Sequence, residues 1–112
     1  VRVEPDVDHA ISGADVVMAL RMQRERQTSG LLPSIREYAQ RYQVTGERMK
    51  QALPGALVMH PGPINRGVEL SSDAADSHHS IILDQVENGV AVRMAVLYLL
   101  NQVRVGEATA AV

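Results

Sequence analysis

Two short apolar runs divide the chain and predict two buried strands. The first is Asp15–Leu20, which is rich in β-branched residues, and the second is Ala56–Met59, which follows Pro54 and Gly55. Unbroken apolar runs are typical of parallel strands that are buried on both faces, because half-exposed strands alternate. We therefore expect both runs to be buried strands of one parallel sheet, with the first buried on both faces.

Helix signals precede the first strand and fill the segment between the two strands. A short helix is expected over Asp6–Ser12, and Gly13 should end it. Ser34 and Glu37 have the spacing of a capping box, which predicts that a helix begins there. A further helix is expected to be capped by Thr45 and to run through Leu53. Its buried positions are expected to be Met49, Ala52 and Leu53.

The last part of the chain is polar at first and then strongly helical. Ser71–His79 is predicted to be irregular, and a helical pattern follows from Ser80 to about Val103. Asn88 and Gly89 interrupt this pattern, which predicts either two helices that meet there or one kinked helix. The order helix, strand, helix, strand, helix predicts an α/β fold with a partial parallel sheet and helical crossovers.

The chain is expected to hold one domain, over residues 1–105, and a frayed tail of small residues over 106–112. It opens at Val1 without a methionine. We expect it to be a piece of a longer protein.

Composition narrows the classes of function. The 112 residues carry a formal net charge of −2 and contain no cysteine, which removes disulfides and cysteine-ligated metals. Arginine and acidic residues are interspersed, without the basic stripe that nucleic-acid binding requires. No apolar stretch reaches transmembrane length. We expect a cytoplasmic protein without a nucleic-acid or membrane partner.

Charged and amide side chains follow the first predicted strand. Arg21 and Gln23 are two residues apart, so an extended backbone would point both side chains the same way. A guanidinium beside an amide suits a dicarboxylate or an amino acid, because the arginine fork binds a carboxylate bidentately. Glu25 could pair with Arg21 and hold it ready. The alternative is a solvated turn without a chemical role.

A loop rich in proline and glycine, His60–Gly67, follows the second predicted strand. Proline fixes φ and lacks an N–H, while glycine admits positive φ, so the loop should be stiff and irregular. Its free backbone carbonyls could hold the NH₂ group of a small substrate. A rigid turn without a chemical role is the alternative. His60 could act as an acid or a base. A lone histidine at the end of a strand is more often a packing or hydrogen-bonding residue, which is the alternative.

Ligands of open parallel sheets bind outside the carboxyl ends of the strands, so both motifs are expected at one sheet edge. The residues alone indicate a site for an anion and an amide. Asp76, His78 and His79 do not predict a metal site, because adjacent histidines diverge and no second pair has ligand spacing.

Three motifs follow one another along the chain. They are Arg21-x-Gln23-x-Glu25-Arg26, His60-Pro61-Gly62-Pro63-x-Asn65-Arg66-Gly67-x-Glu69 and Gln85-x-x-Asn88-Gly89-x-x-x-Arg93. In this order they resemble the C-terminal half of the aspartate carbamoyltransferases, and the resemblance covers the chain from about Val3 to Gln102. Ornithine carbamoyltransferases are less similar, because their loop carries a cysteine after its histidine.

The resemblance implies transfer of a carbamoyl group from carbamoyl phosphate to the amine of L-aspartate, the committed step of pyrimidine synthesis. Arg21 would bind an aspartate carboxylate, with Gln23 supporting that site. Pro61, Gly62 and Pro63 would bind carbamoyl phosphate, mainly through backbone carbonyls to its NH₂ group. The implied fold is a Rossmann-like aspartate-binding domain, here incomplete, and no metal or organic cofactor is implied.

Parts of the family pattern are missing from the chain. They include the Ser-Thr-Arg-Thr phosphate-binding motif and the N-terminal carbamoyl-phosphate domain with its catalytic residues. We therefore expect no certain catalytic residue here, no activity of this chain alone, and partners in the remaining part of the catalytic chain and in a homotrimer. A non-catalytic assembly or binding module derived from the same fold is the alternative. A third is a small-molecule-binding domain of an unrelated transferase.

Two further expectations concern the loop and the last helix. The Gln27–Leu32 loop would close over the substrate. In the family the last helix packs on the first domain, so without that partner its apolar residues would be exposed or self-associate. These residues are Val96, Leu97, Leu99 and Leu100.

Overall fold

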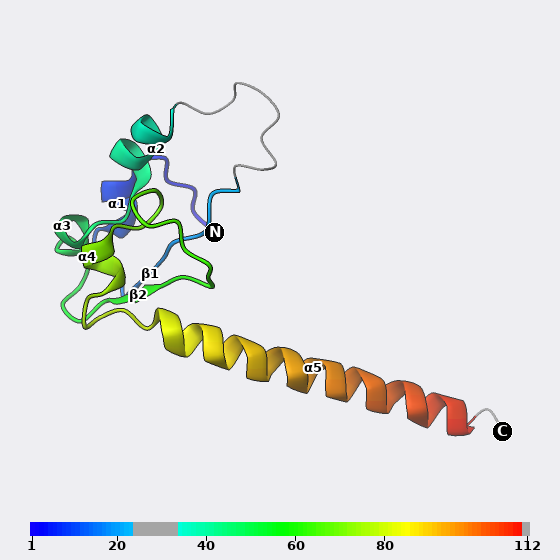
Figure 1. Ribbon diagram of the computed structural model, residues 1–112. Helices are drawn as coiled ribbons and strands as arrows, with labels where there is room; N and C mark the ends of the chain where they lie inside the picture. Colours follow the sequence, from blue (N-terminus) through cyan, green and yellow to red (C-terminus); the bar gives the residue numbers. More distant parts are fainter. Residues whose placement is uncertain (24–33, 111–112) are drawn as a thin grey trace. The chain divides into compact units, whose positions relative to one another are not determined.

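The computed structural model describes residues 1–23 and 34–110, with side chains described as far as residue 102 (Figure 1). Two separate compact units make up the chain, Val1–Ile82 and Leu83–Val112. The first unit contains the elements that position the candidate site.

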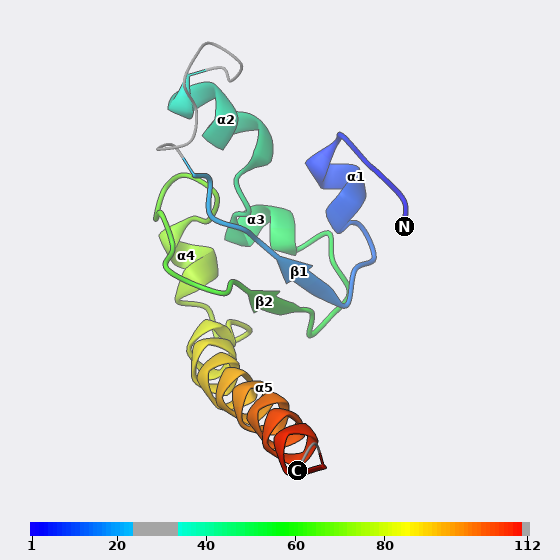
Figure 2. The same ribbon diagram turned by 90° about the vertical axis from the view of Figure 1, so that its right-hand side faces the viewer.

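The first unit is built on a small parallel sheet. Strands β1 (Val16–Met18) and β2 (Leu57–Met59) pair residue for residue along their whole length. The two strands lie side by side in Figure 2. The pairing continues beyond the strands, because the N–H of Ala19 donates to the carbonyl of Met59 at 3.0 Å. The carboxyl ends of both strands therefore lie at the same edge of the sheet.

Helices connect the two strands, as the sequence predicts. Helix α2 (Ile35–Tyr42) begins at a complete capping box. The N–H of Glu37 donates to Ser34 Oγ at 3.3 Å, and the N–H of Ser34 donates to Glu37 Oε2 at 3.2 Å. Helix α3 (Gly46–Met49) follows, so the predicted α/β fold with a helical crossover is confirmed.

The first and third helices begin at capping side chains. Helix α1 (Val7–Ile11) begins where Asp6 accepts hydrogen bonds from two backbone N–H groups of the first turn, and Gly13 follows the helix with φ of +70°. Thr45 caps α3 by accepting from the N–H of Arg48 at 3.2 Å. These local signals place the helix starts correctly because each cap satisfies N–H groups that no earlier helical carbonyl can reach.

The end of α3 was predicted wrongly. The helix ends at Met49, and the chain then turns toward β2, so Leu53 is 44% exposed instead of buried. Met49 and Ala52 do pack against the core. Helix α4 (Ser72–Ala75) corrects a second expectation, because it lies in the segment predicted to be irregular. Its two alanines are buried, and this small apolar contact is too short to show a helical period.

The core occupies one face of the sheet. Val58 of β2 and Val17 of β1 face it, whereas Val16 and Met18 are 46% and 50% exposed. The prediction that β1 is buried on both faces is therefore wrong, since only one face of this two-stranded sheet is covered. The buried core residues are Ile11, Ala19, Val44, Val58, Leu70, Ala74, Ala75 and Ile82.

The long helix α5 (Ile82–Ala110) begins at the last residue of the first unit and makes up nearly all of the second. It is unbroken through Asn88 and Gly89, so the alternative of two helices that meet there is wrong, and it extends beyond the expected end near Val103. The alternative of a kink within one helix stays a prediction. Asparagine and glycine weaken a helix by about 1 kcal/mol each at most, which a helix of this length tolerates. Fraying of residues 106–112 stays a prediction. No helix in the described part of the chain has the length and apolar character needed to cross a membrane.

Several apolar side chains of α5 are exposed, in agreement with the expectation for the last helix. They are Leu83, Val86, Val90, Val92, Met94, Val96, Leu97, Leu99 and Leu100.

Candidate functional site

The structure brings the two strand-end motifs together. Arg21 and Gln23 follow β1, and the proline loop follows β2 at the same sheet edge. The two segments are in direct contact, because Nδ2 of Asn65 donates to the carbonyl of Met22 at 3.3 Å. Arg21 and Gln23 are exposed on either side of the half-buried Met22. An arginine and an amide therefore stand beside the loop.

Two of the predictions near Arg21 fall outside the described residues. These are the support of Arg21 by Glu25 and the closure of the Gln27–Leu32 loop.

The proline loop exposes Pro61 and Pro63 and half-buries Gly62 between them. Gly62 has φ of +68°, a conformation that glycine adopts without a Cβ clash. The peptide bond between Gly62 and Pro63 is cis.

His60 lies beneath this loop and is completely buried, with 0% of its side chain exposed. The N–H of Gly62 donates to His60 Nδ1 at 2.8 Å, so Nδ1 carries no proton. The proton of the neutral ring is then on Nε2, which lies 3.1 Å from Oε1 of Glu69 and donates to it. Because both ring nitrogens are engaged inside the protein, His60 is a hydrogen-bonding residue in this structure and is not placed to exchange a proton with a substrate.

Glu69 is also buried, with 2% of its side chain exposed. Its Oε1 accepts a second hydrogen bond, from the N–H of Asn65 at 2.6 Å. Within the described residues, its other oxygen, Oε2, has no hydrogen-bond partner. Glu69 is a functional residue that the sequence pattern does not single out by itself, although it stands between the apolar residues Val68 and Leu70. A glutamate that is fully buried is almost always paired.

The far end of the loop is held by an ion pair. Both terminal nitrogens of Arg66 donate to the carboxylate of Asp76, each at 2.7 Å. These hydrogen bonds, and the positive charge behind them, hold the pKa of Asp76 below its usual value. Asp76 is thereby engaged in structure, and the described residues contain no group of three or more histidines and acids that could bind a metal.

A cavity of about 330 Å³ lies beside β1 and the start of the Arg21 segment. It is bordered by Leu20, Tyr38, Tyr42 and Glu69, among mostly apolar neighbours. The pKa of the Tyr38 hydroxyl is raised, mainly because the group is partly buried and to a smaller extent because Glu69 and Tyr42 lie nearby.

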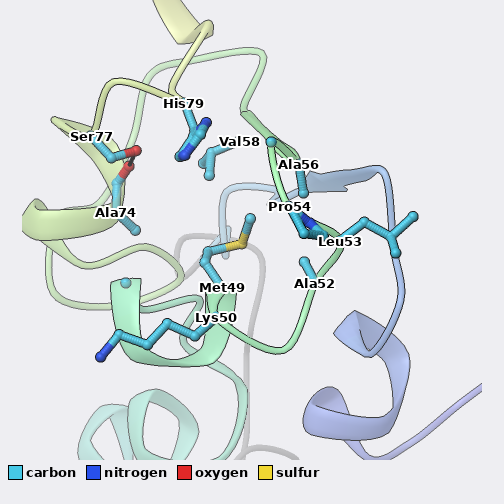
Figure 3. A pocket seen from close by; sticks show the side chains of 12 residues that line it. Met49, Lys50, Ala52, Leu53, Pro54, Ala56, Val58, Ala74, Ser77 and His79 are labelled. Carbon is cyan, nitrogen blue, oxygen red and sulfur yellow. Dashed lines mark hydrogen bonds between the residues drawn. The ribbon is translucent and has the colours of Figure 1, made fainter.

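A second cavity, of about 280 Å³, is lined mainly by apolar side chains, and Figure 3 shows Met49, Val58 and His79 around it. Pro54 and Ala56 also border it, and these residues immediately precede β2. The cavity thus lies at the amino end of β2, whereas the proline loop lies at its carboxyl end. It contains none of the residues predicted to bind substrate.

Comparison with known proteins agrees with the motifs. The family model for the aspartate/ornithine carbamoyltransferase Asp/Orn binding domain matches residues 1–100. The aspartate carbamoyltransferase catalytic subunit of Syntrophotalea carbinolica is 64% identical over 95 residues, which are 85% of this chain and 30% of that protein. The corresponding subunit of Geobacter sulfurreducens is 64% identical over 98 residues, covering 88% of this chain and 32% of that protein.

Solved structures give the same fold. The ornithine carbamoyltransferase of Thermus thermophilus matches with a TM-score of 0.69 at 28% identity, over 85% of this chain and 30% of that one. The ornithine carbamoyltransferase of Pyrococcus furiosus matches with a TM-score of 0.67 at 30% identity, over 82% of this chain and 29% of that one. The chain spans about a third of the length of the curated relatives it matches. With the family's binding-domain model matching almost its whole length, the chain belongs to the aspartate/ornithine carbamoyltransferase family.

Proposed function

We propose that this chain forms one side of the active site of an aspartate carbamoyltransferase. That enzyme moves the carbamoyl group of carbamoyl phosphate to the amine of L-aspartate, giving N-carbamoyl-L-aspartate and phosphate in pyrimidine biosynthesis. The observation that carries the proposal is the hydrogen bond from Asn65 to the Met22 carbonyl, at 3.3 Å. It joins a segment suited to a carboxylate to a loop suited to an amide.

In this proposal Arg21 binds a carboxylate of aspartate and Gln23 supports the same site, with Glu25 holding Arg21 ready. The guanidinium can donate two parallel hydrogen bonds to one carboxylate, which fixes the orientation of the substrate as well as its position. The exposure of Arg21 and Gln23 supports this role, because substrate can reach both side chains.

Carbamoyl phosphate binds at Pro61, Gly62 and Pro63, whose carbonyls accept hydrogen bonds from its NH₂ group. Two prolines keep the loop from rearranging, so the acceptors need little ordering when the substrate arrives. The attack of an amine on the carbamoyl carbon then depends on orientation and on stabilisation of the developing oxyanion. The remaining part of the catalytic chain supplies the phosphate and oxyanion contacts, within a cytoplasmic homotrimer.

Aspartate is favoured over ornithine as the acceptor by two observations. The curated relatives named aspartate carbamoyltransferase are 57–64% identical to this chain, whereas the solved ornithine enzymes from Pyrococcus and Thermus are 30% and 28% identical. Proline also follows His60, where the loop of ornithine enzymes carries cysteine.

A chimaeric enzyme tests the proposal. This chain replaces the matching residues of the Syntrophotalea carbinolica catalytic subunit, and carbamoyl transfer is assayed with aspartate and with ornithine as acceptors. We expect transfer to aspartate at a rate near that of the relative, and no transfer to ornithine. A folded chimaera without activity would support the non-catalytic module instead. The chain assayed alone should show no turnover.

A further inference from the structure

His60 and Glu69 form a buried network beneath the proline loop. One carboxylate oxygen, Oε1 of Glu69, accepts from His60 Nε2 at 3.1 Å and from the N–H of Asn65 at 2.6 Å. The opposite nitrogen of the ring, Nδ1, accepts from the N–H of Gly62 at 2.8 Å. The network thus holds the loop at two backbone N–H groups, those of Gly62 and Asn65.

The bond to Gly62 sets the direction of one peptide group. The described residues have one cis peptide bond, between Gly62 and Pro63, so the preceding bond between Pro61 and Gly62 is trans. In a trans peptide the N–H and the C=O point in opposite directions. Because the Gly62 N–H points inward at the buried ring, the Pro61 carbonyl points away from it.

We propose that His60 is a positioning residue that aims the Pro61 carbonyl at the carbamoyl NH₂ group, and that Glu69 holds the ring in the tautomer this requires. The inference rests on the proposed function, because it assumes that carbamoyl phosphate is the ligand of the loop. His60 acts through Gly62 and does not touch the substrate.

The role of Glu69 follows from the proton on the ring. If the proton were on Nδ1, that nitrogen would face the Gly62 N–H as a second donor, and the hydrogen bond would be lost. A carboxylate accepts only, so Glu69 next to Nε2 keeps the proton there. A buried carboxylate with one oxygen lacking a partner among the described residues is costly. Holding the ring in this tautomer gives the buried carboxylate a role beside the loop.

Two substitutions of His60 in the chimaera separate positioning from packing. His60→Asn keeps an oxygen acceptor near the place of Nδ1, whereas His60→Gln puts an amide donor near the place of Nε2 and loses the acceptor for Gly62. Both remove the ring from the core, so both should lower the thermal midpoint. Only the glutamine variant should weaken carbamoyl phosphate binding, by about tenfold for one lost hydrogen bond, while the asparagine variant stays within about threefold.

Inorganic phosphate is the matched control ligand, because it lacks the NH₂ group. Its affinity should be the same in both variants and in the parent chimaera. The assignment would be overturned if the two folded variants bound carbamoyl phosphate equally well. It would also be overturned if the glutamine variant lost as much affinity for phosphate as for carbamoyl phosphate. Either result would leave His60 as a packing residue.

An experiment without any substitution covers the case in which the variants do not fold. Pro61 and Pro63 have no N–H, so Gly62 carries the single exchangeable amide between them. We expect this amide to exchange slowly in the chimaera before any substrate is added, because it is bonded to His60. Exchange as fast as an unprotected loop amide would contradict the inference, and the result does not depend on whether the chimaera is active.

Discussion

His60 and Glu69, nine positions apart in the sequence, meet in the protein interior through a 3.1 Å hydrogen bond between Nε2 and Oε1. Neither side chain is accessible enough to contact a substrate directly. The pair instead connects the end of β2 with the chain that leaves the proline loop. The surface that we assign to carbamoyl phosphate is therefore supported by a polar contact in the core.

Replacing Glu69 by leucine should destabilise the chimaera far more than replacing it by glutamine. Leucine leaves the Nε2–H of His60 and the N–H of Asn65 without an acceptor, at about 1–3 kcal/mol for each buried group. Glutamine keeps an oxygen acceptor. Thermal unfolding of both variants checks this, and equal midpoints would show that the hydrogen bonds contribute little.

At the N-terminus of α3, one substitution should lower the thermal midpoint in one background and raise it in another. The Asp73 carboxylate accepts from the N–H of Gly46 at 2.9 Å, and a Cβ at Gly46 would collide with that carboxylate. Gly46→Ala should therefore lower the thermal midpoint, because Asp73 must move and its hydrogen bond is lost.

In an Asp73→Ala background the same Gly46→Ala change should raise the midpoint, since alanine favours a helix over glycine by up to about 1 kcal/mol. A destabilising effect of similar size in both backgrounds would mean that the contact with Asp73 is not its cause.

Acid should destabilise the first unit through Asp76. Its pKa is held below the ordinary value of 3.8 by the hydrogen bonds from Arg66 and then by the positive charge of that residue. A lowered folded-state pKa gives stability that is present above pH 3.8 and is lost as the pH falls through the folded-state value. The loss of thermal midpoint between pH 5 and pH 3 should be smaller in Asp76→Asn than in the parent.

Tyr38 should titrate above its ordinary pKa of 10.0, because it is partly buried and lies near Glu69 and Tyr42. Ultraviolet titration of the chimaera and of a Tyr38→Phe variant isolates its signal. Glu69→Gln removes the negative charge and should move the Tyr38 pKa back toward its ordinary value. An unchanged titration in that variant would exclude Glu69 as a cause.

Local signals in the sequence were sufficient for the helix starts. The capping box of Ser34 and Glu37 and the cap at Thr45 are confirmed, because each depends on residues within one helical turn. The two apolar runs, together with the geometry of parallel strands, were also sufficient to predict that the Arg21 motif and the proline loop lie at the same edge of the sheet.

Long-range packing explains what could not be predicted. The exposure of Met18 depends on whether anything covers the outer face of β1, which an apolar run does not reveal. The end of α3 before Leu53 depends on how the chain must turn to reach β2. The role of Glu69 could be recognised only from its contact with His60 across the loop, because the sequence does not show which residue pairs with an acid.

We propose that this chain binds the two substrates at different places, aspartate at Arg21 and carbamoyl phosphate at the proline loop. Steady-state kinetics of the Arg21→Ala chimaera, with exposed Arg36→Ala of α2 as the matched control, tests it most directly. We expect the KM for aspartate to rise at least about tenfold, the loss from a charge-assisted hydrogen bond, while the affinity for carbamoyl phosphate stays within about twofold. Equal losses for both substrates, or the same kinetics as Arg36→Ala, would contradict the account.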